Sequence, residues 1–203
     1  MMRMFSTQGH RGAESFGRQG MPGFSASLRL CVSIACLVAA GTAVAAGFDY
    51  ALKPERVADG VFAFVGRSED FTTANGGNIV NTGFIVAPGG LIVIDSGPSL
   101  RYGQQMRQAM AVVGGQPLAL LINTHHHPDH FLGNQAFAGT TIAALPATTQ
   151  GIATEGNAFA ENLFRLTGDW MKGTEVVVPT RSLLAGTSEI AGRRLRLIAL
   201  DGH

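Results

Sequence analysis

Hydrophobic residues in the middle of the chain occur in short runs of strand length, separated by turn residues. Residues 57–65 contain two such runs around a turn at Asp59-Gly60 and predict a hairpin. Residues 78–86 and 91–95 are two further strand-like runs, and the turn between them contains Pro and Gly. A polar loop that contains glycine precedes them at 66–77. The pattern therefore predicts a β-meander.

The hydrophobic period becomes helical at residues 99–113, and the expected helix leads to an apolar run at 118–122. We therefore expect a right-handed crossover to a buried parallel strand. Trp170 and Phe164 could line a substrate-binding site, although core packing is the commoner role of such aromatic residues. Alternating strands and helices predict an α/β fold. The remaining expected elements are a helix at 131–137, a strand at 141–145, helix and loop at 146–172, an extended segment at 175–178 and a hairpin over 188–200.

Residues 1–46 have the features of a secretory signal peptide. Arg29 precedes an apolar run at 30–40, and small residues with an Ala-x-Ala pattern at Ala43 and Ala45 follow. The apolar run is shorter than the roughly 20 residues that a membrane span needs, and a transmembrane anchor is the alternative interpretation. Signal removal would leave one domain in the periplasm or outside the cell, without a stable membrane anchor.

Both cysteines, Cys31 and Cys36, lie in this segment, so the mature chain would have neither a disulfide nor a thiolate ligand. Met21 is an alternative start that gives a signal peptide of more ordinary length. Residues 47–203 contain 11 basic and 13 acidic residues. This near-neutral balance does not indicate a nucleic-acid partner and leaves a small-molecule substrate as the expectation.

Imidazole groups are concentrated directly after the apolar run at 118–122, where His125, His126, His127 and His130 lie within six residues. In an extended chain alternate side chains share a face, so His125 and His127 point the same way. Pro128 favours extended backbone at His127. His126 faces away and is not expected to bind a metal.

Asp129 and His130 add a carboxylate and an imidazole to the same loop. These groups suit Zn²⁺, and Mn²⁺ or Fe²⁺ are alternatives. A bound zinc ion lowers the pKa of its water toward about 7, which would provide hydroxide for hydrolysis. Three other interpretations stay open: Asp129 is only a helix N-cap, the histidines form a surface loop, or they bind a metal without catalysis.

The pattern His125-x-His127-x-Asp129-His130 resembles the signature of the metallo-β-lactamase superfamily. The resemblance implies an αββα sandwich with one or two zinc ions, the first bound by the first two histidines and the second by Asp129 and His130. Asp95, in Asp95-Ser96-Gly97, is similar to the family's supporting aspartate. The ending Asp201-Gly202-His203 is similar to the third motif and makes His203 the expected third ligand of the first ion.

The resemblance implies an exported zinc hydrolase in which metal-bound hydroxide attacks a carbonyl or ester carbon and Asp129 orients the nucleophile. A metal-binding periplasmic accessory protein without hydrolytic activity is the alternative. Residues 48–103 and 123–137 are also similar to quinoprotein relay system metallohydrolases, which implies a quinoprotein dehydrogenase system as partner. Because the chain stops at His203, residues 47–203 are expected to be only the N-terminal portion of the family's domain.

Overall fold

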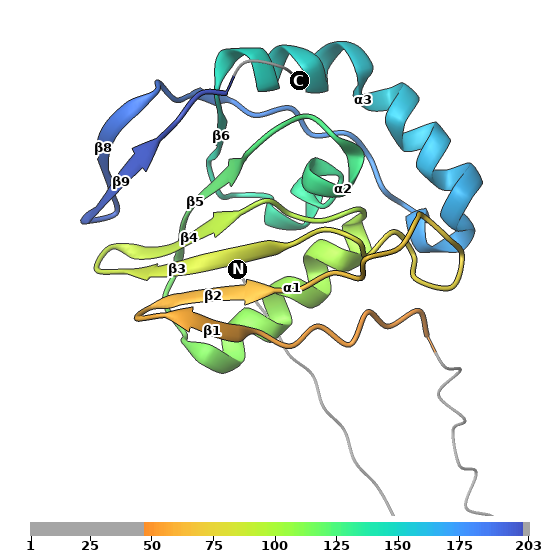
Figure 1. The fold of residues 1–203 in the computed structure, drawn as a ribbon, viewed down its shortest axis with the longest axis horizontal. Coiled ribbons are helices and arrows are strands. Elements are labelled where there is room, and N and C mark those ends of the chain that lie inside the picture. Colours follow the sequence, from red (N-terminus) through yellow and green to blue (C-terminus); the bar gives the residue numbers. More distant parts are fainter. Residues whose placement is uncertain (1–46, 201–203) are drawn as a thin grey trace, which may run out of the picture. The chain divides into compact units, whose positions relative to one another are not determined.

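The strands follow the hydrophobic runs of the sequence in the structure, a computed structural model that describes residues 47–200 (Figure 1). The expected signal peptide at 1–46 and the expected ligand His203 lie outside the described residues. Within the described residues, no helix is long and apolar enough to cross a membrane.

Seven strands form one sheet in which the spatial order equals the chain order. The first four strands are antiparallel neighbours, and the fourth to the seventh are parallel. The last two strands pair with each other in a separate antiparallel sheet. The strands are β1 (Glu55–Ala58), β2 (Val61–Phe64), β3 (Thr82–Ala87), β4 (Gly90–Ile94), β5 (Leu118–Asn123), β6 (Ile142–Ala144), β7 (Arg181–Ser182), β8 (Gly186–Ile190) and β9 (Arg193–Leu197).

The predicted β-meander is confirmed, but β3 begins at Thr82 rather than at residue 78. The N–H of Asn78 donates to the Asn75 carbonyl at 3.0 Å, and the N–H of Ile79 donates to the Gly77 carbonyl at 2.8 Å. Because these donors are used in local turns, the first residues of the apolar run do not join the sheet.

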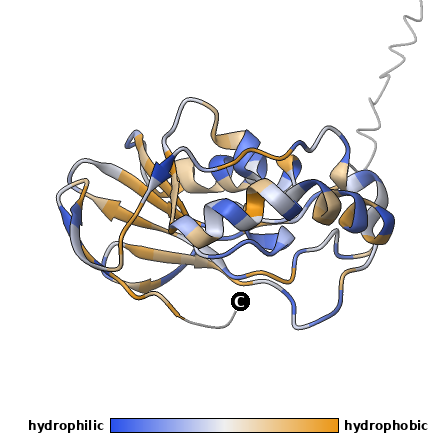
Figure 2. Ribbon diagram, turned by 90° about the horizontal axis from the view of Figure 1, so that it is seen from above, coloured by the Kyte–Doolittle hydropathy of each residue, from blue (hydrophilic) through white to orange (hydrophobic). Residues whose placement is uncertain are grey.

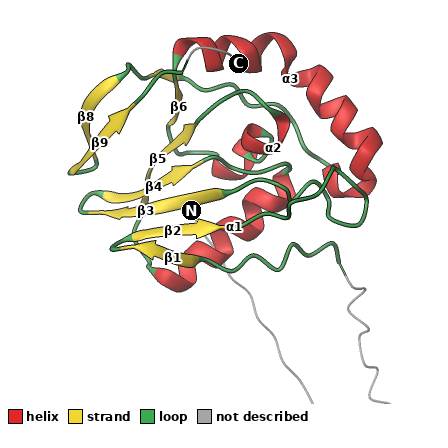
Figure 3. Cartoon of the chain, in the orientation of Figure 1, coloured by secondary structure: helices red, strands yellow, loops and turns green. Residues whose placement is uncertain are grey.

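Helices connect and cover the parallel strands (Figure 3). Ser99 caps α1, since its hydroxyl accepts from the Tyr102 N–H at 3.1 Å, and Gly114 is the C-cap residue after the last helical residue, Val113. The sequence predicts this helix correctly. The helices are α1 (Leu100–Val113), α2 (Pro128–Phe131), the 3₁₀ helix η1 (Asn134–Phe137), α3 (Pro146–Thr167) and the 3₁₀ helix η2 (Gly168–Met171).

The predicted single helix over 131–137 is wrong. The chain instead forms α2, which starts at Pro128, and then η1. Proline suits the first turn of a helix because its missing N–H is not needed there. A tight turn at Gly133 separates the two pieces, and a Cβ added at Gly133 would lie 2.0 Å from the carbonyl oxygen of Ser96. Contact with the loop after β4 therefore interrupts the helix.

The seven-stranded sheet is covered on both faces at its centre, and the hydropathy colouring shows apolar residues along its strands (Figure 2). Val93 and Leu121 face α1 and pack near Met106. Their neighbours Ile92 and Leu120 face the opposite side, where the β8 and β9 hairpin packs. This alternation follows from the period of two along a strand.

One edge of the sheet gathers the loops that carry polar side chains. The parallel strands β4, β5 and β6 all end at this edge. Because β3 is antiparallel to β4, the connection between β2 and β3 reaches the same edge. The fold therefore brings Asp95, the histidine loop and residues 65–81 to a common side of the sheet.

Candidate metal centre

His125 and His127 face each other at the end of β5. His127 has φ −69° and ψ 146°, the extended conformation that a following proline favours. The Nε2 atom of His125 lies 3.2 Å from the Nδ1 atom of His127, and the ring centroids are 4.7 Å apart. The two ring nitrogens therefore lie within hydrogen-bond distance of each other.

His126 points toward α3 instead. Its ring lies so close to Gly151 that a Cβ added there would be 2.6 Å from the imidazole Cγ. Its Nε2 atom lies 3.8 Å from Glu155 Oε1, and its ring centroid is 6.0 Å from that of Phe159. The structure thus separates His126 from the converging pair.

Asp129 and His130 form a second pair in α2. His127 occupies the N-cap position of this helix, so the interpretation of Asp129 as an N-cap is wrong. Asp129 Oδ2 lies 3.7 Å from His130 Nε2. The His130 ring also lies beside that of His125, with centroids 3.9 Å apart. The two pairs are therefore adjacent.

Asp95 links the end of β4 to both parts of this loop. Its carboxylate is buried and accepts from the Thr124 N–H, the Thr124 hydroxyl and the His130 Nδ1–H, each at 2.8 Å. Asp95 has φ 57°, a left-handed conformation that aspartate tolerates better than most residues. With Nδ1 as the donor, His130 keeps the lone pair of Nε2 available for a cation.

His130 has a raised pKa although it is largely buried. Burial by itself lowers the pKa of the imidazole, but the hydrogen bond to Asp95 and the charges of Asp95 and Asp129 outweigh this effect. The ring therefore binds a proton readily, and a metal at Nε2 would displace that proton.

The distance between two of the ring nitrogens suits a pair of ligands of one zinc ion. Zinc–nitrogen bonds of about 2.0–2.1 Å at a tetrahedral ion place two nitrogens roughly 3.3 Å apart. The 3.2 Å separation of His125 Nε2 and His127 Nδ1 agrees with this value. Among residues 47–200, no three His, Cys, Asp or Glu side chains form a group that could hold a metal together. His203, the expected third ligand, lies outside those residues.

A buried polar cluster lies beneath the histidine loop, and the sequence did not predict it. Asn123, Asn134 and Ser96 are fully or almost fully buried and are hydrogen-bonded to one another. The available signal was the polar Asn134, which lies three residues from both Phe131 and Phe137 and so shares their side of the helix expected there. A polar side chain in such a place needs partners.

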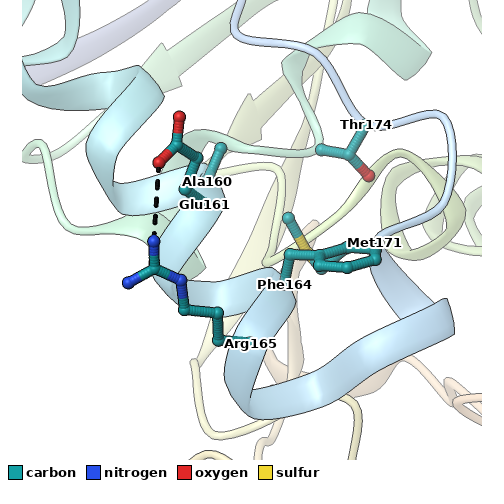
Figure 4. Close-up of a pocket in the computed structure, with 6 residues that line it drawn as sticks. All are labelled: Ala160, Glu161, Phe164, Arg165, Met171 and Thr174. Atoms are coloured by element: carbon teal, nitrogen blue, oxygen red, sulfur yellow. Dashed lines mark ion pairs between the residues drawn. The ribbon is translucent and has the colours of Figure 1, made fainter.

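A cavity of about 420 Å³ adjoins the histidine loop. His125, His126, Thr124 and Thr148 supply its polar groups, and the remaining lining is apolar. A hollow of about 450 Å³ lies elsewhere, along the end of α3 (Figure 4). Phe164 lines that second hollow, which contains none of the loop histidines. Trp170 instead packs in the core against Tyr50, so neither aromatic residue lines the metal loop.

The parallel part of the sheet thus ends beside a loop of imidazoles and carboxylates, which are groups that can bind a metal ion. Residues 75–186 match the model of the metallo-beta-lactamase superfamily. The chain belongs to this superfamily. The α/β metallo-β-lactamase fold expected from the sequence is therefore confirmed.

Solved structures resemble this chain at the level of the fold. A metallo-beta-lactamase from Cronobacter sakazakii, a HARLDQ motif mutant, has a TM-score of 0.52 and 20% identity over 71% of this chain and 53% of its own. A beta-lactamase domain protein from Burkholderia ambifaria has a TM-score of 0.50 and 20% identity over 70% of this chain and 46% of its own. This chain thus spans about half the length of these proteins.

A curated relative matches a shorter stretch. The linear primary-alkylsulfatase of Pseudomonas sp. (strain ATCC 19151) is 36% identical over 53 residues, which is 26% of this chain and 10% of the relative.

Proposed function

We propose that this chain carries the zinc-binding loop of a metal-dependent hydrolase that acts on a carbonyl or ester-type bond of a small molecule. The observation that carries the proposal is the 3.2 Å separation between His125 Nε2 and His127 Nδ1, which suits two ligands of one tetrahedral ion. Superfamily membership supports the hydrolytic class.

In this proposal His125 and His127 bind one zinc ion, and His203 supplies a further ligand. Asp129 and His130 begin a second site, so one or two ions are bound, with Mn²⁺ or Fe²⁺ as alternatives. When bound, zinc supplies an activated water for hydrolysis at neutral pH. Asp129 accepts a hydrogen bond from the attacking water and orients it. Asp95 holds the His130 ring through Nδ1.

The substrate enters the cavity of about 420 Å³ beside His125. Apolar side chains at Leu145, Ile198 and Leu200 line it together with the hydroxyls of Thr124 and Thr148. This lining suits an apolar group next to the bond that is cleaved. Because the alkylsulfatase relative is named for a substrate with an alkyl chain, alkyl sulfates belong in a substrate panel.

The features of residues 1–46 support export, and we propose a periplasmic or secreted location. We also propose a second candidate, which rests on the resemblance of the sequence at 48–103 and 123–137 to quinoprotein relay system metallohydrolases. In it, the protein is a metal-binding accessory of a quinoprotein dehydrogenase system and does not hydrolyse a substrate.

Zinc content of the purified chain tests the site, with variants His127→Ala and His126→Ala compared with wild type. Loss of His127 removes a ligand, so the zinc bound after dialysis should fall by at least about tenfold. His126→Ala is the matched control, since its ring lies against α3, and it should retain zinc. Equal zinc content in wild type and His127→Ala would contradict the ligand assignment.

Hydrolysis is then measured for β-lactam, thioester, lactone, phosphodiester and alkyl sulfate substrates with the zinc-loaded protein. Turnover of any of them that depends on His127 supports the hydrolase. Zinc binding by the full-length protein without turnover of any substrate in the panel would favour the accessory role.

A further inference from the structure

Two asparagines form a reciprocal amide pair beneath the histidine loop. Asn134 Nδ2 donates to Asn123 Oδ1 at 2.8 Å, and Asn123 Nδ2 donates to Asn134 Oδ1 at 3.1 Å. Asn134 also accepts from the Ser96 hydroxyl at 2.8 Å and donates to the Val177 carbonyl at 2.9 Å. With 0% and 2% of their surfaces exposed, Asn134 and Asn123 are shielded from water. The Asn134 amide therefore uses its full hydrogen-bonding capacity within the protein.

This pair reaches the metal loop through the backbone carbonyl of His130. That oxygen accepts from the Ser96 N–H at 2.8 Å, the Ser96 hydroxyl at 3.3 Å and Asn123 Nδ2 at 3.3 Å. The His130 ring is held separately, because its Nδ1 donates to Asp95. One constraint therefore fixes the side chain and another fixes the backbone of the same residue.

We propose that the pair formed by Asn123 and Asn134, together with Ser96, is a positioning device for the metal ligands Asp129 and His130. The inference rests on the proposed function. Holding the His130 carbonyl fixes the backbone of the last turn of α2 and hence where Asp129 Oδ2 and His130 Nε2 lie. A small displacement of the backbone would move both donor atoms together, and Asp95 alone could not correct the position of Asp129.

The chemistry of the pair favours this role over simple core filling. A fully satisfied buried amide network fixes one geometry, because any shift leaves polar atoms without partners. An apolar pair of the same size would tolerate sliding. The network also joins the ends of β4 and β5 to η1, which are the elements that meet at the loop.

A purely structural role for Asn134 makes a different prediction. In that case the variants would lower stability and leave the intrinsic metal affinity of the folded chain unchanged. Asn75 provides a matched control, since it is also buried and its side chain also makes four hydrogen bonds. All of those bonds stay within the loop between β2 and β3.

The test compares wild type, Asn134→Asp, Asn134→Ala and Asn75→Ala in the full chain. Asn134→Asp keeps the volume but removes both amide donors and buries a carboxylate, whereas Asn134→Ala removes the same hydrogen bonds without adding a charge, so each variant tests the inference where the other does not fold. Zinc affinity is measured by competition with a chelating dye. The absorption spectrum of the cobalt-loaded chain reports the ligand geometry, and thermal melting of the metal-free chain reports stability.

We expect both Asn134 variants to bind zinc about 10- to 100-fold more weakly, as is typical when a partner of a metal ligand is lost. Their cobalt spectra should change as well. Asn75→Ala should melt at a lower temperature but retain wild-type affinity and spectrum. Wild-type affinity in Asn134→Asp would overturn the inference, and so would an equal loss of affinity in Asn75→Ala. A wild-type chain that bound no zinc would instead refute the proposed function itself.

Discussion

The substitution Asp95→Asn tests how the histidine loop is held. It leaves the volume of the side chain unchanged and removes its charge. Asparagine tolerates the left-handed conformation of residue 95 as well as aspartate does, so the substitution adds no backbone strain. Any effect therefore comes from the lost charge beside His130 and from the three hydrogen bonds that the carboxylate accepts from Thr124 and His130.

An amide nitrogen cannot accept any of these bonds. If the amide nitrogen took the place of Oδ1, it would place its own N–H groups against the Thr124 N–H, and a backbone N–H can only donate. At the Oδ2 position it could donate to the Thr124 hydroxyl and to His130 Nδ1, provided that the imidazole moves its proton to Nε2. The least costly arrangement therefore blocks the atom that His130 would offer to a metal.

The magnitude follows from the change in bond type. Hydrogen bonds to charged groups contribute roughly 1 kcal/mol more than neutral ones, so three of them predict a loss of about 3 kcal/mol in unfolding free energy. Zinc affinity should fall by at least about tenfold. Urea unfolding, followed by fluorescence of the single tryptophan, Trp170, measures the first quantity. Dye competition measures the second.

Asp59→Asn serves as the control, since the Asp59 side chain is 98% exposed and its ion pair with Arg56 lies at the surface. It should change stability by less than about 0.5 kcal/mol. Should Asp95→Asn behave like this control in both stability and zinc affinity, the account of Asp95 as the support of the loop is wrong.

Other substitutions test the surrounding structure. Burial raises the pKa of Tyr50 to about 12, so its contribution to stability is complete below pH 10, the ordinary tyrosine pKa, and is lost as the pH rises toward 12. Melting temperatures measured from pH 9 to 12 should therefore decline less steeply in Tyr50→Phe, and an unchanged slope would contradict this. Gly133→Ala should cost at least about 2 kcal/mol in chemical unfolding because its Cβ would strike the Ser96 carbonyl. Gly115→Ala, with no atom within 4 Å of its Cβ, should stay within about 0.5 kcal/mol of wild type in the same assay. Leu121→Ala, in the core beneath α1, should lower the urea midpoint by an amount equivalent to about 2–5 kcal/mol, and a smaller loss would show that the core collapses around the gap.

The fold was predictable where local sequence decides the conformation. Ile92 and Val93 lie on opposite faces of the sheet, as the period of two along any strand requires. The helix expected at 99–113 forms as α1, and its bounds depend on local residues, since Ser99 caps its start and Gly114 follows its end. The backbone at His127 was predictable too, because the restriction that Pro128 imposes depends on no other part of the chain.

The sequence predictions failed where distant segments touch. The helix expected over 131–137 is divided because Gly133 packs against Ser96, which lies 37 residues earlier in the chain. The start of β3 was misplaced because turn bonds near Asn78 compete with the sheet. Neither contact leaves a periodic signal in the sequence, so hydrophobic patterning does not reveal it.

The same division applies to the candidate site. A period of two and one proline, both local, are enough to bring His125 and His127 together. The orientation of His130 depends on Asp95 and on the amide pair of Asn123 and Asn134. These three residues lie at the end of β4, in β5 and in η1. The histidine loop thus specifies which atoms can bind a cation, and the core beneath it specifies where the second pair of donors points. Metal affinity should therefore be sensitive to buried residues that cannot themselves bind a metal.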